Sequence, residues 1–419
     1  MKQRNYIEGM FATTNLWAIT VQIYEMFCVK VISPPRYDKD NDFSQQSFLF
    51  SFFHCGRFAE ETFVFLQLLT VQFSISQRCS SISDIIVQAG KHLIQICIPV
   101  WSTAFLVHQN ASSKAFIHNI LFISAFKQQN FNPLDILQIH SQLVIGIIFI
   151  VFCNCISLGL KINLQKIASF SFNFCVFSRL VCSVLVVFLT KNAHILFFPF
   201  FQIYLYAIAI YVSTVFWRFE VNEFGITNTQ IQHIPPTYHL LVKFLCSKSN
   251  LVGDMLITIL TAFGSGFLVK FVHQTESDFL SNKLMGIFVL AFGRVGWILV
   301  FYMSIVPVFY DFAPLTNRFL ACPIFTSLGV HANENFIGAI VVLQTLLQAT
   351  KGMQVGPYNN GTVLLAVGGV MSLTLVGGQL IAQLFSLIVK AIVSKIDRYW
   401  ELQKTKRVAM QIRQKMVNK

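Results

Sequence analysis

Charged residues are scarce in this sequence. Only 12% of the 419 residues are Asp, Glu, Lys or Arg, whereas 55% are hydrophobic. A soluble domain carries about 25% charged residues, so this chain has too few of them to cover an ordinary water-facing surface. The composition therefore excludes a soluble enzyme, a nucleic-acid-binding module and a disordered chain, and it predicts a membrane protein with many spans.

The motifs of metal, nucleotide and hydrolase sites are also absent. The ten histidines form no HExxH and no i,i+4 pair, the cysteines form no CxxC, and no GxSxG, P-loop or GxGxxG occurs. We therefore expect no metal site and no cofactor, and we expect reduced cysteines that behave as small hydrophobic side chains. The glycines of residues 263–267 lie between apolar segments, and we interpret them as packing glycines.

Long apolar runs recur along the chain. In lipid a helix satisfies its own backbone hydrogen bonds, and the runs lack the alternation of barrel strands. We therefore predict an all-α polytopic membrane protein with about ten transmembrane helices. The expected spans are residues 10–32, 47–76, 84–107, 136–160, 164–190, 195–217, 251–273, 284–309, 324–349 and 362–393. A shorter run at 115–126 predicts a half-span or interfacial segment, and residues 219–250 form the longest polar connection. The first run contains Glu25 and no small-residue cleavage site, so we expect no secretory signal.

Composition divides the chain into a transmembrane helical region, residues 1–394, and a basic C-terminal segment, residues 395–419. The segment carries eight Lys and Arg against two Asp and Glu, and it predicts a juxtamembrane helix along the membrane surface. Because such residues bind anionic headgroups or set orientation, the net charge of +13 does not imply nucleic acid as a partner. The expected lipid or partner contacts are Arg398, Trp400, Lys404, Lys406, Arg407 and Arg413.

Charged residues inside the spans are costly unless they are paired, so each is a functional candidate. The densest group is Arg57, Glu60 and Glu61, whose spacing allows pairing within one helix. We favour this self-neutralised cluster over an ion or substrate site. The isolated charges are expected to be partnered or to reach towards the membrane surface, and they are Lys91, His92, Arg179, Asp254 and Arg294.

Five segments, taken in order, resemble motifs of the membrane acyltransferase-3 family in its nose-resistant-to-fluoxetine branch. Residues 7–24 are similar to the opening motif "LDGIRxLSMxWVILGHTY", and residues 59–66 are similar to "SVDTFFFLSG". The other similar segments are residues 92–101, 251–253 and 319–328. The likeness extends over nearly the whole chain through short, loose motifs. The resemblance implies a helical membrane fold. It also implies an activity that transfers an acyl group from acyl-CoA to a hydroxyl group of the acceptor.

The resemblance also implies that the catalytic positions have been lost. Gln22 stands where the family has a first-span His as general base, and an amide cannot take up the proton. Leu93 and Ile96 replace two Arg that would hold the phosphates of the acyl donor. Further replacements are Phe11 for an Arg and Ala339 for a late His, whereas the acid Glu61 is kept. We expect a pseudoenzyme whose former pocket, bounded by Gln22, Glu61 and His92, is closed by apolar side chains.

The leading hypothesis is a non-catalytic, acyltransferase-like integral membrane protein that serves as a structural or accessory subunit of a larger membrane complex. Its expected partners are other membrane subunits and anionic lipids such as cardiolipin. Analogy with complexes that carry many added membrane subunits favours the mitochondrial inner membrane and a respiratory complex. Two alternatives stay open. One is an active membrane O-acyltransferase that uses acyl-CoA, and the other is a transporter, which needs paired charges near the midplane.

Overall fold

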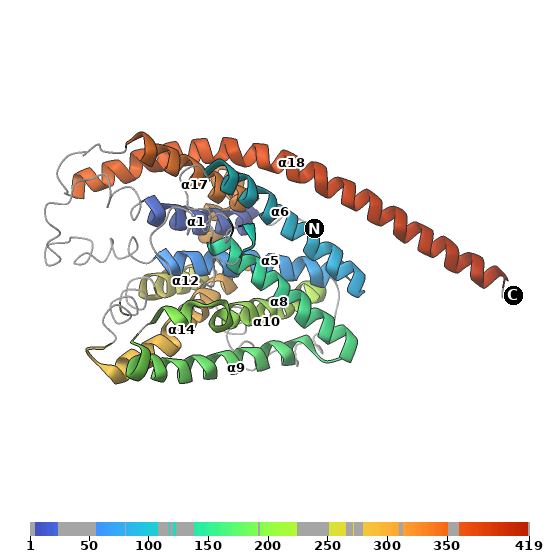
Figure 1. Ribbon diagram of the computed structural model, residues 1–419, viewed down its shortest axis with the longest axis horizontal. Helices are drawn as coiled ribbons and strands as arrows, with labels where there is room; N and C mark the ends of the chain where they lie inside the picture. Colours follow the sequence, from blue (N-terminus) through green and yellow to red (C-terminus); the bar gives the residue numbers. More distant parts are fainter. Residues whose placement is uncertain are drawn as a thin grey trace.

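The computed structural model is helical in all the secondary structure that it describes (Figure 1). It describes residues 5–23, 56–79, 81–107, 117, 120–122, 138–191, 193–223, 251–264, 271, 280–309, 313–350 and 360–417. The half-span at 115–126 and the connection at 219–250 fall largely outside these residues. The all-α expectation is confirmed for the described part.

Four helices are long and apolar enough to cross a membrane. They are α8 (Gln138–Leu160), α9 (Leu164–Leu185) with the π-helical turn η6 (Val186–Thr190), α14 (Lys283–Phe309) and α18 (Asn360–Val417). Each corresponds to one of the expected spans. These four segments identify the chain as a membrane protein.

The remaining helices pack around and between these four, and most run side by side across Figure 1. They are α1 (Asn5–Ile23), α5 (Gly56–Arg78), α6 (Ile82–Val107), α10 (Ile203–Glu223), α12 (Leu251–Phe263), α15 (Pro314–Leu320), α16 (Pro323–Val330) and α17 (Ala332–Ala349). Two short 3-10 turns, η7 (Ala193–Phe197) and η8 (Pro199–Gln202), join α9 to α10. Helix α5 lies at the centre, where it contacts α1, α6, α8, α10 and α14, and its Phe63, Phe65 and Leu68 are fully buried.

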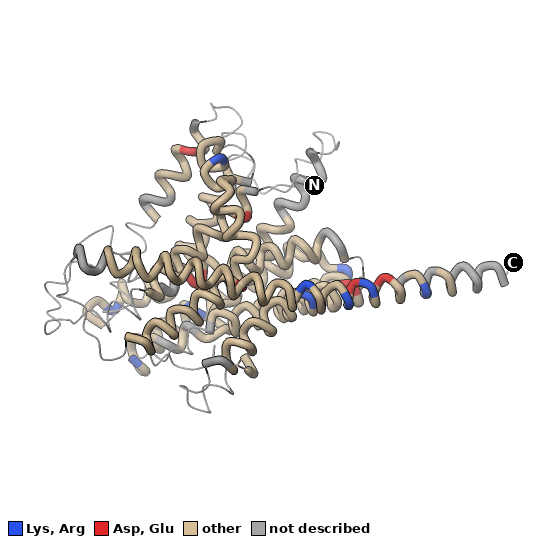
Figure 2. Tube along the Cα trace, turned by 90° about the horizontal axis from the view of Figure 1, so that it is seen from above, with Lys and Arg blue, Asp and Glu red and all other residues tan. Residues whose placement is uncertain are grey.

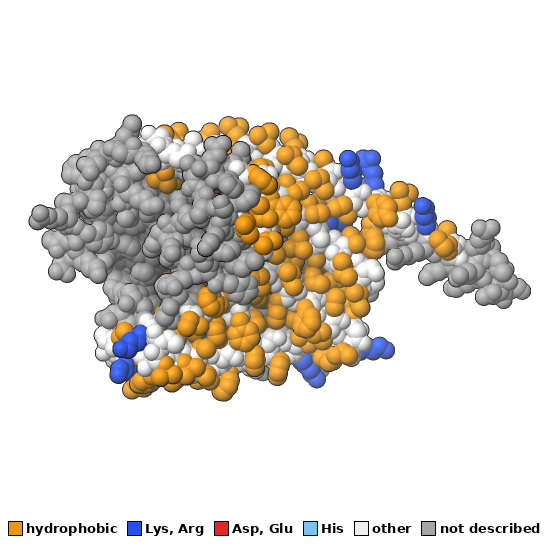
Figure 3. All heavy atoms as spheres, in the orientation of Figure 1, with side chains coloured by type: hydrophobic (Ala, Val, Ile, Leu, Met, Phe, Trp, Pro, Cys, Tyr) orange, Lys and Arg blue, Asp and Glu red, His pale blue; other side chains and the backbone are white. Residues whose placement is uncertain are grey.

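On the face drawn in Figure 3, apolar side chains cover most of the described surface, and Lys and Arg side chains lie towards its two ends. On α9 the exposed side chains include Phe170, Phe177 and Leu189, which are 72%, 65% and 72% exposed. The exposed Lys166 and Lys191 flank this helix, about 38 Å apart at the helical rise of 1.5 Å per residue. That separation matches a hydrocarbon core of about 30 Å with its interfaces. Phe170 and Phe177 of α9 therefore face lipid, whereas Phe172 packs against the core.

Glycines bring helix backbones into direct contact at three places. A Cβ atom on Gly9 would overlap the carbonyl of Leu320, and one on Gly329 would overlap the carbonyl of Glu8. Between α17 and α18, a Cβ on Gly338 would lie 2.5 Å from the carbonyl oxygen of Gly378. Gly378 therefore allows a close approach of α17 and α18, whereas a Cβ at Gly368 or Gly369 would meet open space.

Helix α18 continues without a break from the last span into the basic C-terminal segment. At 1.5 Å per residue its 58 residues extend about 87 Å, which is far more than a membrane needs. No Gly or Pro occurs between residues 379 and 417, so nothing in this stretch interrupts the helical hydrogen bonds. The segment therefore extends beyond the ends of the other helices instead of forming a separate helix at residue 395 (Figures 1 and 2).

Candidate functional site

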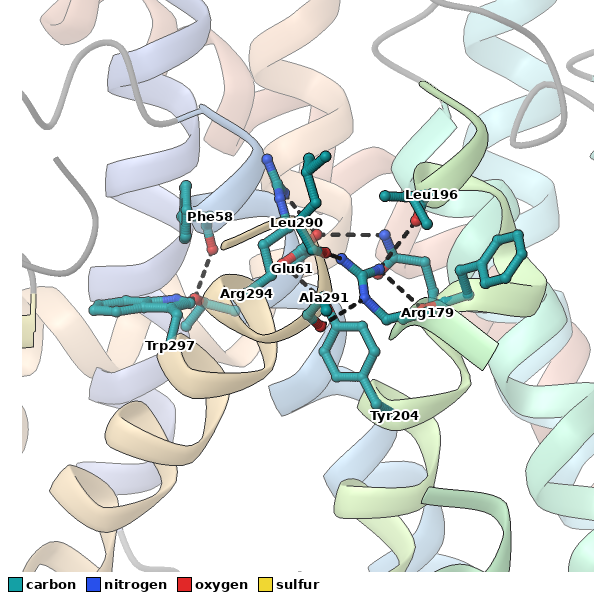
Figure 4. Close-up of polar contacts among 12 residues, drawn as sticks. Phe58, Glu61, Arg179, Leu196, Tyr204, Leu290, Ala291, Arg294 and Trp297 are labelled. Atoms are coloured by element: carbon teal, nitrogen blue, oxygen red, sulfur yellow. Dashed lines mark hydrogen bonds and ion pairs between the residues drawn. The ribbon is translucent and has the colours of Figure 1, made fainter. Parts of the chain in front are cut away.

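The buried carboxylate of Glu61 lies at the centre of the bundle, where α5, α10 and α14 meet (Figure 4). Its Oε1 accepts a hydrogen bond from Arg294 Nη1 of α14 at 2.7 Å, and both side chains are 3–4% exposed. Tyr204 Oη donates to Oε2 at 3.2 Å, and Gln202 Nε2 donates to Oε1 at 3.4 Å. Such an ion pair persists in a low-dielectric interior only when further hydrogen bonds satisfy its remaining atoms, as they do here.

Aromatic side chains enclose the same ion pair. The Arg294 guanidinium lies over the Phe58 ring, 4.7 Å from its centroid, and Trp297 packs edge-on against that ring. The indole nitrogen of Trp297 donates to Thr62 Oγ1 at 3.0 Å, and Thr62 Oγ1 in turn donates to the Phe58 carbonyl at 2.6 Å. Each polar atom in this wall is engaged within the bundle, which makes the group a rigid support and not an exposed reactive centre.

Arg179 lies beside this network and is held by backbone carbonyls. Its Nε donates to Ala291 O at 3.2 Å, and Nη2 donates to Leu290 O at 2.8 Å. Its Nη1 donates to Leu196 O at 3.0 Å and to Phe201 O at 3.1 Å. The carbonyls of Leu196 and Phe201 lie in the 3-10 turns that follow α9, which interrupt the regular helical ladder and leave carbonyls free, whereas Leu290 and Ala291 lie within α14. Arg179 therefore ties α9, α14 and the η7–η8 connection together.

The charge pairing differs from the pattern expected within one helix. Glu61 pairs with Arg294, which lies 233 positions away in the sequence. Glu60 Oε1 instead accepts a hydrogen bond from Gln22 Nε2 at 3.0 Å, and the side chain of Arg57 lies outside the described residues. The prediction of a self-neutralised helix was wrong for Glu61, because helix spacing reveals neighbours on one helix but not those that tertiary packing supplies.

The other isolated charges are partnered as well. Asp254 of α12 accepts the backbone N–H groups of Leu315 (3.1 Å) and Thr316 (2.8 Å), and so caps the start of α15. Lys91 of α6 forms an ion pair with Asp397 of α18. Trp400 Nε1 donates to Asp84 Oδ1 of α6 at 3.3 Å. These last two contacts hold α18 against α6 at the point where α18 leaves the bundle.

A partly open cavity of about 270 Å³ is the second polar region of the bundle. It is lined by residues of α1, α5, α6, α8, α16 and α17, and none of the described lining residues is Lys or Arg. The polar lining consists of Glu8, Gln67, Thr70, His92, Gln95, Asn333 and Glu334. The apolar lining includes Phe11, Val71, Ile96, Leu143, Ile147 and Val330.

The structure separates the three residues that were expected to bound one pocket. His92 lines the cavity together with Glu8, whereas Gln22 lies about 20 Å farther along α1. Glu61 is enclosed in the ion pair with Arg294 and is not part of the cavity lining. The expectation of one apolar-filled pocket at Gln22, Glu61 and His92 is therefore wrong, because the retained polar groups belong to two different places.

The remaining family positions have mixed environments. Phe11 and Ile96 are buried in the cavity wall, and Leu93 packs partly buried against the core. Ala339 is buried at the contact of α17 with Gly378. Of the expected tail contacts, Trp400 bonds to Asp84, whereas the side chains of Lys404, Arg407 and Arg413 lie outside the described residues.

Sequence reasoning did not identify the acidic residues of the cavity, Glu8 and Glu334. In the sequence both residues lie at the ends of apolar runs. Ordinary residues at the membrane interface occupy the same positions, so this location alone does not indicate a site. Sequence reasoning also missed Gln72 of α5 and Asn154 of α8, whose buried amides bond to each other with Asn154 Nδ2 2.8 Å from Gln72 Oε1. The seven described cysteines form no disulfide with one another.

Comparison of the chain with protein-family models, with curated proteins and with solved structures gave no match. The acyltransferase-3 resemblance therefore stays a prediction based on the short motifs.

Proposed function

We propose that the chain is a non-catalytic, multi-pass membrane protein of acyltransferase-3-like descent that serves as a structural or accessory subunit of a larger membrane complex. The observation that supports this proposal is the bonding of the Glu61 carboxylate inside the bundle. Of the acids expected from the family, Glu61 is the one retained, and its carboxylate is bonded to Arg294, Tyr204 and Gln202 inside the bundle. A carboxylate held in this way supports the packing of three helices and has no oxygen free for a substrate.

The lost base is consistent with the same proposal. Gln22 is buried and donates its amide to Glu60, so the position that would abstract a proton is engaged in a helix–helix contact. No Lys or Arg lies among the described residues of the 270 Å³ cavity, so the cavity offers no clamp for the phosphates of acyl-CoA. These features favour a structural role over the acyltransferase alternative.

Our proposed membrane topology has about ten crossings. In this topology the four apolar helices are joined by six further crossings, which are α1, α5, α6, α10, α12 and α17. The basic part of α18 then leaves the membrane on one side, where anionic lipids and neighbouring subunits are within reach. A mitochondrial inner-membrane complex is the setting that we propose for these partners.

The experiment is purification of the full-length tagged protein from its native membrane in a mild detergent. We expect other membrane subunits to co-migrate with it in fixed stoichiometry. Removal of residues 401–419 should leave membrane insertion unchanged and reduce the amount recovered in the assembly. A protein that migrates alone, or a truncated one that assembles in full yield, contradicts the subunit role.

Acyl transfer gives an independent test. We expect the purified protein neither to hydrolyse acyl-CoA nor to transfer its acyl group, and we expect Gln22→His to restore no activity because positions 93 and 96 still lack a cation. Turnover by the unaltered protein, or by this single variant, would establish the enzyme alternative.

A further inference from the structure

The cavity of about 270 Å³ combines an acidic, hydrogen-bond-accepting wall with an apolar wall. Glu8 from the first turn of α1 and Glu334 from the first turn of α17 supply two carboxylates. No described residue forms an ion pair or a side-chain hydrogen bond with either carboxylate. At about 30 Å³ per water, the volume equals roughly nine waters, enough for a small organic molecule.

Further acceptors lie in the same wall. The side-chain oxygen of Asn333 is buried beside the His140 ring, which is a hydrogen-bond donor to it, and its second lone pair can accept from a ligand. The amide nitrogen of Asn333 donates to the Gln95 carbonyl at 3.4 Å. Gln95 Oε1 lies 3.2 Å from His92 Nδ1, so the imidazole is held in place by its own helix.

The charge of this wall is only partly balanced. The one described cation with an electrostatic effect on Glu334 is Lys390 of α18, whose side chain is exposed and which does not line the cavity. Isolated carboxylates in a membrane-embedded bundle are costly unless a positive group pairs with them. We propose that this cavity binds a primary ammonium group, with Glu8 and Glu334 as its counter-charges and the Asn333 oxygen as a third acceptor.

The apolar wall determines what accompanies the ammonium group. Phe11, Ile96, Leu143 and Ile147 offer a surface for a short hydrocarbon chain, as ligand pockets commonly do beside a few convergent polar groups. The ion pair of Lys91 with Asp397 places the neighbouring His92 near the end of the bundle from which α18 emerges. From that surface the ammonium could come from a free aliphatic amine or from the ethanolamine headgroup of a phospholipid.

The test uses the full-length protein, first in detergent and then in lipid nanodiscs. Calorimetric titration with n-hexylamine is compared with titration with n-hexanol and n-hexanoate. These two molecules have a hydrocarbon chain like that of the amine but carry a hydroxyl or a carboxylate in place of the ammonium group. We expect saturable binding of the amine alone. The lipid source is tested by the thermal unfolding midpoint in nanodiscs of phosphatidylcholine with and without phosphatidylethanolamine, where we expect a higher midpoint if the headgroup enters the cavity.

Two near-isosteric variants locate the site. Glu8→Gln and Glu334→Gln should each weaken the binding of hexylamine by about tenfold or more, because each removes a charge-assisted hydrogen bond. Glu401→Gln, on the exposed part of α18, is the matched control and should bind as the unaltered protein does. The comparison of hexylamine, hexanol and hexanoate needs only the unaltered protein. It therefore tests the ammonium site even if a variant does not fold.

The outcomes are distinct from those of the subunit proposal. Equal binding of hexanol and hexylamine, unchanged affinity in both Glu→Gln variants, or absence of any response to both amine and phosphatidylethanolamine would each overturn the ammonium site. A response to the lipid but not to hexylamine, lost in Glu8→Gln, supports the site with the headgroup as its ligand. These binding results do not depend on whether partner subunits co-purify with the protein.

Discussion

Breaking the buried pair of Glu61 and Arg294 should strongly destabilise the bundle. In Glu61→Gln the amide replaces the carboxylate that accepts Arg294 Nη1 at 2.7 Å, so the guanidinium keeps its charge and loses its counter-charge. Both side chains are 3–4% exposed, so water cannot replace the lost partner. Removal of one member of a buried ion pair costs about 3–5 kcal/mol, and we expect a loss of that size in the free energy of unfolding.

An exposed carboxylate provides the control. Glu401 lies on the exposed part of α18, so Glu401→Gln should change the free energy of unfolding by no more than about 0.5 kcal/mol. Reversible unfolding in mixed micelles measures both variants, and Glu61→Gln combined with Arg294→Met should show a coupling of about 1–3 kcal/mol. Equal losses in the two single variants would refute the view that Glu61 supports the packing.

Two further predictions concern packing contacts in the same bundle. Arg179→Lys should lower the free energy of unfolding by about 2 kcal/mol or more, because an ammonium group cannot reach the four carbonyls that the guanidinium binds, and thermal unfolding in detergent measures this loss. Gly378→Val should lower the unfolding midpoint markedly, since its side chain would meet the backbone nitrogen of Ala339 at 2.9 Å. Gly369→Val is the matched control with open space around it and should change the midpoint little, and similar midpoints for the two variants would contradict the close contact.

The apolar runs predicted the described spans well because the membrane imposes the same requirement on every residue that faces it. The expected span 164–190 coincides with α9 and its π-helical turn, and the expected span 136–160 begins within two residues of the start of α8. Burial inside lipid is a local property of each segment. Hydropathy along the chain is therefore enough to find it.

The site could not be predicted in the same way because its contacts join distant parts of the chain. Arg294 reaches Glu61 only because α14 packs beside α5, and the six helices around the cavity contribute two or three residues each. Helical spacing instead suggested Arg57 as the partner of Glu61. The continuity of α18 is visible in the sequence as a long stretch without Gly or Pro, but the change from apolar to basic residues at Lys395 suggests a boundary there.

The contact at Gly378 has a mechanical consequence for the end of α18. The first turn of helix α17 contributes Asn333 and Glu334 to the cavity wall. Farther along, the backbone of α17 packs directly on that of α18 at Gly338 and Gly378. Val417 lies 39 residues beyond that contact, about 58 Å along a stiff rod. A tilt of about 5° at this pivot would move the far end by about 5 Å, on the order of one helical turn. The long helix thus acts as a lever that amplifies small shifts of α17 at a distance from the membrane.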